Sequence, residues 1–376
     1  MFLALCVRIL RFVRISNTVD HREDAASRNV LDEWVASEVF GEAIGRPVRV
    51  GISLTSRHDV TDPRLGARWM IERAAAARRT GLDSLFVGDL HATAAPYYQN
   101  VPILGRLLAE WGSAPAGCLF LLPLWNPVLV AEQVGTLGAI AEGRFIFQCA
   151  LGGGEEQFAA MGANVRHRPS AFEEALDIIK RLLAGETVTS SSRFSIRAAR
   201  VALWPPEHVE YWIGASAKPA IDRAARLGDG WLASPSLPPD EAREQAIYYQ
   251  ERCAAHGRPP RAVAIRRDVY VGESPADARA VVEHAVATDY RGFAPKALVY
   301  GSVVEVTDQL RALGAMGYTD VIVRHLIDDQ PCVLSSLSRL GRVRDALQEA
   351  EVEATRGTHQ SPHHPKPRAT RESRIE

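Results

Sequence analysis

The chain has 376 residues, of which 47% are hydrophobic and 24% charged, and its formal net charge is -1 at pH 7. This apolar content can bury a sizeable core, in one large α/β domain or two smaller ones, and the balanced charge argues against a nucleic-acid partner. Five cysteines show no disulfide or zinc spacing, which favours a reducing, cytoplasmic compartment.

The first apolar stretch, residues 1–16 (MFLALCVRILRFVRIS), is interrupted by Arg8, Arg11 and Arg14. A membrane-spanning helix needs roughly 20 predominantly apolar residues, and a secretory signal carries its charges before the apolar run. We therefore predict no integral membrane segment here. Residues 1–47 are interpreted as an N-terminal extension outside the core, with an amphipathic surface helix as the alternative.

After this extension, short apolar runs alternate with helical patterns. The Asp-Pro pair at 62–63 and the Asn-Pro pair at 126–127 suit helix starts, because proline is favoured at the first helical position. Ser170 and Glu173 fit a capping box. The runs predicted as strands are residues 48–54, 84–88, 116–122, 144–151, 209–214, 229–234, 262–272 and 319–326.

Three later segments depart from this alternation. Residues 186–206, with Thr, Ser and β-branched side chains, are predicted as a hairpin excursion between the fourth helix and the fifth strand. Residues 275–317 are predicted as a longer helical region. A final helix is expected over 332–350, and residues 351–376, with almost no apolar side chains, are expected to be a disordered tail.

The eight strand-like runs together predict the fold. Most of them are too apolar to have a solvated face, and such strands separated by helices favour a parallel sheet covered by helices. Eight units over roughly 300 residues match a (β/α)8 TIM barrel, here over 48–350, with a doubly wound open sheet as the alternative.

In such a barrel the active site is built from the loops that follow the strands. Several polar or small residues end predicted strands or come shortly after them, and we expect them to meet at one mouth. They are Asp89 and His91 in GLDSLFVGDLHAT, Gly152, Ser234, Arg324 and His325.

The stretch YWIGASAKPA predicts an anion site. Small residues let backbone N–H groups approach an anion, and a helix N-terminus adds partial positive charge. A plain strand-to-helix turn with a serine cap is the alternative. The residues of the predicted cradle are Gly214, Ala215, Ser216, Ala217 and Lys218.

Several segments resemble the bacterial luciferase-like superfamily of flavin- or deazaflavin-dependent oxidoreductases, a barrel family. They are GLDSLFVGDLH, LLPLWNPVLVAEQVGTLGAIAEGRFIFQCALG, FEEALDIIKRLLAGE and IDRAARLGDGWL, and the similarity runs from about residue 49 to 350. The resemblance implies an irregular, often cis, peptide near Cys118 and Leu119 against the cofactor ring. It also implies that the cofactor phosphate lies at the cradle of residues 214–218.

The resemblance is incomplete at two positions. Asp89 occupies the family's acid position, but Leu90 stands where members such as the luciferase catalytic subunit place a working histidine, and His91 comes one residue later. Leu151 stands where luciferase-type members tend to have an arginine for the phosphate.

The resemblance implies an oxidoreductase or monooxygenase that binds F420 or FMN, with Asp89, His91 and His325 as acid–base candidates. The aromatic residues expected near the mouth favour a small, apolar substrate; they are Trp125, Trp231, Tyr97 and Tyr98. The family often forms homodimers. A barrel that binds a flavin without turnover is one alternative, because of Leu90. A metal-dependent hydrolase is disfavoured, because only His58 and Asp59 follow the first strand and no metal-ligand cluster is evident.

Overall fold

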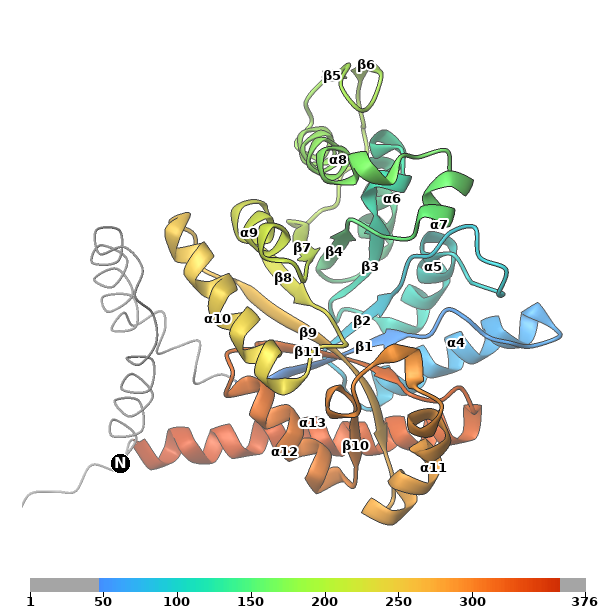
Figure 1. The fold of residues 1–376 in the computed structure, drawn as a ribbon, viewed down its shortest axis with the longest axis vertical. Coiled ribbons are helices and arrows are strands. Elements are labelled where there is room, and N and C mark those ends of the chain that lie inside the picture. Colours follow the sequence, from blue (N-terminus) through green and yellow to red (C-terminus); the bar gives the residue numbers. More distant parts are fainter. Residues whose placement is uncertain (1–46, 359–376) are drawn as a thin grey trace, which may run out of the picture.

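Eight parallel strands close into a barrel in the structure, a computed structural model that describes residues 47–358 (Figure 1). Each strand pairs with the next along the chain, and the last pairs with the first, with Arg49 opposite Asp320. The predicted (β/α)8 barrel is therefore confirmed, and the open-sheet alternative is wrong. The strands are β1 (Arg49–Leu54), β2 (Ser84–Val87), β3 (Ala116–Leu121), β4 (Phe145–Ala150), β7 (Glu210–Gly214), β8 (Gly230–Ala233), β9 (Ala262–Val271) and β11 (Asp320–His325).

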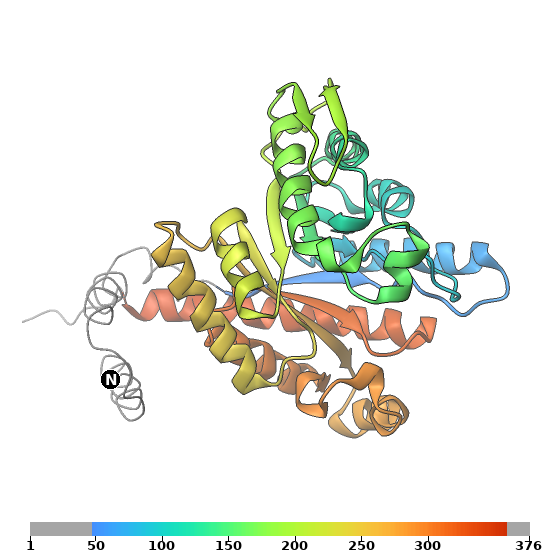
Figure 2. The ribbon, with the colours of Figure 1, turned by 45° about the horizontal axis from the view of Figure 1, so that its top comes forward.

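Helices surround this barrel on the outside (Figure 2). The long ones are α4 (Pro63–Arg79), α5 (Asn100–Trp111), α6 (Pro127–Ile140), α8 (Arg168–Leu183), α9 (Lys218–Leu227), α10 (Pro239–Ala255), α11 (Pro275–Ala287), α12 (Val303–Gly314) and α13 (Gln330–Thr358). Short helices follow β3, β4 and α11: η1 (Leu122–Leu124), α7 (Glu155–Ala160), η2 (Val165–His167), η3 (Tyr290–Gly292) and η4 (Pro295–Ala297). None of the helices in residues 47–358 has the length and apolar content that crossing a membrane requires.

The helix starts follow local sequence, with one correction. Asp62 and Asn126 cap α4 and α6 through their side chains, as predicted. Ser170 does not cap α8, which already begins at Arg168 with a proline in its first turn, so Ser170 Oγ donates to the His167 carbonyl instead. A reciprocal capping box occurs at the start of α12.

Three further segments refine the sequence picture. The hairpin excursion lies where it was expected, as the antiparallel pair β5 (Val188–Ser190) and β6 (Ile196–Ala199). The region 275–317 is not wholly helical, because β10 (Val299–Gly301) pairs with the end of the ten-residue β9. The last helix runs to Thr358, past the predicted boundary at 350. The rest of the predicted tail and residues 1–46 lie outside the described residues.

Alternation along the strands separates two kinds of buried side chain. One set fills the barrel interior, and its members are Phe86, Ile146, Trp212, Ala262, Ala264 and Ile322. Their strand neighbours belong to a larger cluster that packs the barrel wall against the helices. Since successive strand residues point to opposite faces, this alternation decides which residue at each strand end faces the mouth.

Candidate functional site

A cleft lies at the C-terminal ends of the barrel strands. It has a wide part with a volume of about 410 Å³ and a narrow, deeper part of about 60 Å³. Leu119, Leu232 and Arg266 line both parts, so the two adjoin. Residues far apart in the sequence meet here. Of the predicted strand-end residues, Gly152, Ser234 and Arg324 line the cleft, whereas Asp89, His91 and His325 do not.

The wide part contains most of the predicted cradle. Gly152, Ser234 and the segment 214–217 (Gly214, Ala215, Ser216 and Ala217) all line it. Ala217 is the N-cap of α9 and offers no capping side chain, unlike Asp62 at α4. Pro219 has no N–H, and the Ala220 amide already donates to the Ala217 carbonyl at 2.8 Å. The Lys218 amide is therefore the first N–H of α9 that can serve a ligand or water, at a helix end that suits an anion.

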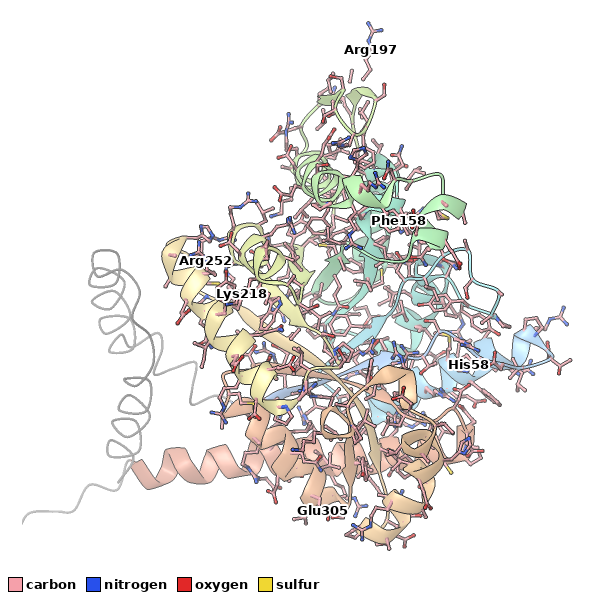
Figure 3. All side chains as sticks on the ribbon, in the orientation of Figure 1. His58, Phe158, Arg197, Lys218, Arg252 and Glu305 are labelled. Carbon is pink, nitrogen blue, oxygen red and sulfur yellow. The ribbon has the colours of Figure 1, made fainter. Side chains whose placement is uncertain are left out.

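Lys218 does not direct its charged group into this cradle. Its side chain is exposed between α9 and α10 (Figure 3), and Nζ lies 5.5 Å from the ring centre of Tyr248. A cation–π contact with a neighbouring helix directs the charge away from the cleft. The predicted role of Lys218 as a point charge for the phosphate therefore has no support in the geometry.

Arg168 supplies a positive charge that the sequence reasoning did not find. It lines the wide part, and its Nη1 donates to the Gly152 carbonyl at 3.1 Å. Leu151 lines the same part but carries no charge. Two short helices, α7 and η2, lie between β4 and Arg168. Only the fold therefore brings Arg168 to the position at which an arginine directly after β4 was expected.

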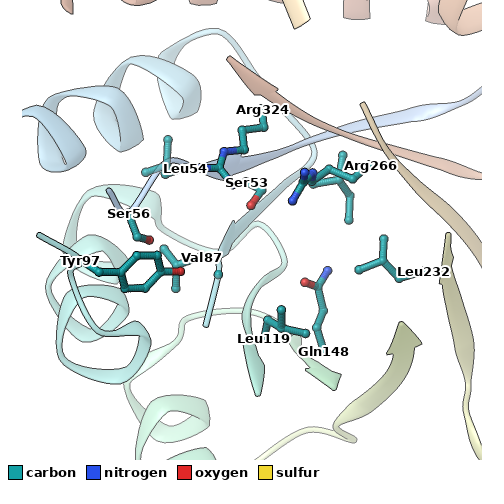
Figure 4. Close-up of a pocket in the computed structure, with 12 residues that line it drawn as sticks. Ser53, Leu54, Ser56, Val87, Tyr97, Leu119, Gln148, Leu232, Arg266 and Arg324 are labelled. Carbon is teal, nitrogen blue, oxygen red and sulfur yellow. The ribbon is translucent and has the colours of Figure 1, made fainter. Parts of the chain in front are cut away.

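The narrow part is polar. Arg266 and Gln148 point into it, the Arg324 guanidinium lies beside Ser53, and Tyr97 stands at one side (Figure 4). Burial lowers the pKa of Arg266 to about 10, and burial raises the pKa of Tyr97. At neutral pH, Arg266 therefore stays charged and the Tyr97 hydroxyl keeps its proton.

The loops that follow β1 and β2 are joined across the rim. Arg57 and Tyr97 form an antiparallel bridge, and the amide of Tyr98 donates to the Ser56 carbonyl at 2.8 Å. This pairing holds Tyr97 over the narrow part. After β4 the rim is built differently, since Gly152 and Gly154 both adopt positive φ, 67° and 85°.

Asp89 and His91 lie together but behind the cleft wall. Asp89 Oδ2 accepts hydrogen bonds from the Leu121 amide and from Trp125 Nε1, both at 2.8 Å. His91 Nε2 is 3.0 Å from Asp89 Oδ1, and its ring meets Trp125 edge-on at 5.1 Å. Neither residue lines either part of the cleft. In this arrangement the pair fixes the end of β3 and η1.

His325 also lies away from the cleft. Ile322 and Arg324 line the narrow part, so the alternation of β11 turns Val323 and His325 outward toward the helices. His325 is buried there, and burial followed by the nearby charge of Arg73 lowers its pKa to about 3. The acid–base role predicted for His325 is corrected on these grounds, because the side chain cannot reach a ligand in the cleft.

The same alternation divides Cys118 from Leu119. Leu119 lines both parts of the cleft, whereas Cys118 is buried against the helices. The Leu119 carbonyl accepts a hydrogen bond of 2.7 Å from Asn100 Nδ2. No cis peptide bond occurs in residues 47–358, so the peptide at this position, for which the resemblance implied an irregular and often cis bond, is trans.

The described residues offer no metal centre. Within 47–358, no three His, Cys, Asp or Glu side chains gather as metal ligands would. His58, which follows β1, instead places Nδ1 2.9 Å from Asp328 Oδ2 in a buried network outside the barrel.

Comparisons with known proteins agree with this fold. A family model described as luciferase-like monooxygenase matches residues 48–356. An F420-dependent glucose-6-phosphate dehydrogenase of Microbacterium testaceum is 27% identical over 213 residues, 54% of this chain and 61% of that protein. The chain thus spans less than two thirds of that relative's length.

Two solved structures have the same fold. One is an F420-dependent secondary alcohol dehydrogenase in complex with an F420–acetone adduct, with a TM-score of 0.67, 17% identity and coverage of 80% of this chain and 99% of that one. The other is the oxygenating constituent of 3,6-diketocamphane monooxygenase from the CAM plasmid of Pseudomonas putida, in complex with FMN. Its TM-score is 0.69, with 17% identity and coverage of 79% and 97%.

Proposed function

Because the chain belongs to the luciferase-like monooxygenase family, we propose that it is an oxidoreductase that binds F420 or FMN in the cleft and acts on a small organic molecule. The observation that carries this proposal is the wide part of the cleft, which combines an apolar floor with an uncapped helix start and an arginine. Relatives and fold neighbours that use F420 or FMN support the choice of cofactor.

The residues present fit a ring cofactor that carries a phosphate. Leu119, Leu232 and Ala150 offer an apolar surface to a ring. Gly214 also lines the wide part and has no side chain that would narrow it. The N-terminus of α9 and Arg168 offer donors and positive charge to the phosphate. The volume, about 410 Å³, falls in the range of roughly 300–1,000 Å³ typical of small-molecule sites.

When bound, such a cofactor supplies the hydride or oxygen chemistry. The chain contributes binding, orientation and proton handling. Arg168 and the first turn of α9 hold the phosphate, and Leu119 and Leu232 exclude water from the ring. The Tyr97 hydroxyl, protonated at neutral pH because burial raises its pKa, is the proton-bearing group that already lines the cleft.

Asp89 and His91 remain the predicted acid–base pair, provided that the His91 side chain can rotate toward the cleft. His91 Nε2 lies beside Asp89 Oδ1, so the imidazole has to turn out of the cleft wall to reach a ligand. If it does, His91→Ala should lower kcat about a hundredfold with cofactor affinity little changed. Unchanged turnover in this variant assigns the proton transfer to Tyr97 or water.

Cofactor binding tests the proposal directly. The purified protein is titrated with F420 and with FMN, and the absorption of the bound fraction identifies which one binds. Arg168→Gln should weaken binding about tenfold through loss of a charge-assisted contact, whereas Arg166→Gln, an exposed control two residues earlier, should not. Binding of neither cofactor, or equal affinity in both variants, contradicts the proposal.

A second candidate, a barrel that binds the cofactor without turnover, is favoured by one observation: neither His91 nor His325 lines the cleft. Stopped-flow mixing separates the two candidates. Reoxidation of the reduced cofactor that accelerates with a panel of small organic substrates supports the enzyme, and a tightly bound cofactor that stays inert supports the second candidate.

A further inference from the structure

The narrow part of the cleft is closed by hydrogen-bond donors that the chain leaves without acceptors. Within residues 47–358, Arg266 Nη2, Arg324 Nε and Gln148 Nε2 are buried and have no hydrogen-bond partner. All three side chains line the narrow part; Arg266 and Gln148 point into the space between them, and the Arg324 guanidinium lies beside Leu54 and Ser53 (Figure 4). Because buried polar groups are almost always paired in folded proteins, three such donors around one small space indicate a place for an acceptor.

The charge around these donors is unbalanced. Of the three donor side chains, Arg266 contacts a carboxylate, that of Asp268, whose Oδ1 lies 3.1 Å from Arg266 Nε. Its Oδ2 is already occupied, by the Tyr290 hydroxyl at 2.9 Å and by Arg291 Nη1 at 3.0 Å. In the described part of the chain, no carboxylate lies within ion-pair distance of Arg324. The narrow part therefore carries an excess of positive charge away from bulk water, where an opposite charge is most stabilising.

The size of the narrow part limits what can enter. Its volume of about 60 Å³ corresponds to roughly two water molecules of about 30 Å³ each. A carboxylate or the oxygens of a phosphate group fit this space, but a ring system does not. Leu119 and Leu232 line both this space and the wide part, which adjoin, so the remainder of such a molecule would extend toward the cofactor.

We propose that Arg266, Arg324 and Gln148 form a subsite for an anionic oxygen group, and that the substrate carries a carboxylate or phosphate there. This inference rests on the proposed function, since it takes the wide part as the cofactor site. It replaces the expectation of an apolar substrate. The rival occupant is the edge of the cofactor ring. A ring that is neutral when oxidised, such as that of FMN, would leave uncompensated the charge of Arg324, which, unlike Arg266, has no carboxylate beside it in the described residues.

Titration with inorganic phosphate tests the subsite. Calorimetry on the cofactor-loaded protein is the main measurement, because the cofactor's own phosphate then fills the cradle at α9. Arg324→Gln should weaken phosphate binding about tenfold to a hundredfold, through loss of a charge-assisted pair, and change cofactor affinity less than about twofold. Arg197→Gln removes the same charge at the exposed tip of the hairpin (Figure 3) and should leave both affinities unchanged.

Each result has one meaning. Equal phosphate affinity in wild type and Arg324→Gln, or no phosphate binding to wild type at all, overturns the subsite. Weaker cofactor binding with unchanged phosphate binding also overturns it and assigns the two arginines to the ring. If neither cofactor binds, the titration is repeated on the cofactor-free Arg168→Gln protein. If phosphate affinity in that protein falls when Arg324 is replaced by Gln, the subsite is supported and the proposed function fails. If phosphate affinity does not change, the subsite is overturned as well.

Discussion

Arg73 and Arg324 are two arginines on opposite sides of the barrel wall, and the chain treats them differently. Outside the barrel, Arg73 donates from Nε to Gln330 Oε1 at 2.7 Å, and from Nη1 and Nη2 to the carboxylate and carbonyl of Asp328, both at 2.9 Å. Inside the barrel, Arg324 Nε has no partner in the described residues. The protein supplies hydrogen-bond acceptors to the first guanidinium, whereas the second has a buried donor that a bound molecule could use.

This contrast separates architecture from function at the strand ends. Arg324 and His325 are neighbours in the chain, yet one lines the cleft and the other lies in the helix layer near Arg73. Substitutions in the helix layer should therefore act on folding stability. Substitutions in the cleft should act on ligand affinity and have little effect on folding.

The largest expected effect is that of Arg73→Met. Removing this guanidinium leaves Asp328 and Gln330 without their hydrogen-bond donor, so the free energy of unfolding should fall by about 2 to 4 kcal/mol. The loss is smaller than for a fully buried ion pair because Asp328 is partly exposed. Urea denaturation measures it. Arg68→Met, on the exposed side of the same helix, is the control and should change stability by less than about 0.5 kcal/mol. A loss below about 1 kcal/mol for Arg73→Met would remove the basis of the contrast.

Gly214→Val should act on the opposite side of the contrast. A Cβ added at Gly214 would lie 3.3 Å from Ala150 Cβ. Both residues line the wide part, so the larger valine side chain would narrow the cleft. Cofactor affinity should fall about tenfold to a hundredfold, as measured by fluorescence titration. Gly105→Val, in α5 away from the cleft, controls for the lost glycine. Undiminished affinity in Gly214→Val would place the cofactor elsewhere.

The pH dependence of stability should identify His325 as part of the helix layer. Burial, and then Arg73, lowers its pKa to about 3 in the folded protein, against about 6.5 in an unfolded chain. As pH falls, the unfolded chain takes up the proton first, so the stabilising contribution is complete above about pH 6.5 and is lost toward pH 3. From pH 8 to 5.5 the unfolding free energy should drop by about 1 kcal/mol more in wild type than in His325→Gln. Parallel pH profiles for the two proteins would contradict this.

The smallest effect is expected from Arg324→Met on stability. An arginine with an unpartnered buried nitrogen and a like charge beside it does not stabilise the fold, so the unfolding free energy should stay within about 0.5 kcal/mol of wild type or rise. Thermal and urea unfolding without ligand provide the comparison. A loss of 2 kcal/mol or more would mean that Arg324, like Arg73, is part of the architecture.

Sequence reasoning predicted the barrel because most of the eight strands are near-continuous apolar runs. It found the small residues 214–217 because they lie between a strand and a helix. It missed β10, since three residues carry no usable periodicity. It also missed Arg168 and Arg266, because which distant residues line a cleft depends on helix placement and strand alternation. His325 was misassigned for the same reason, because moving one position along a strand turns the side chain from the cleft to the helix layer.

The bridge between Arg57 and Tyr97 also bears on how molecules enter and leave. Backbone hydrogen bonds secure the rim beside β1 and β2, so parting it there would break main-chain pairs. Beside β4 the segment 152–154 has glycines at positive φ and no comparable pairing. Exchange with solvent should therefore proceed past that segment, whose opening rate would set the residence time of whatever is bound.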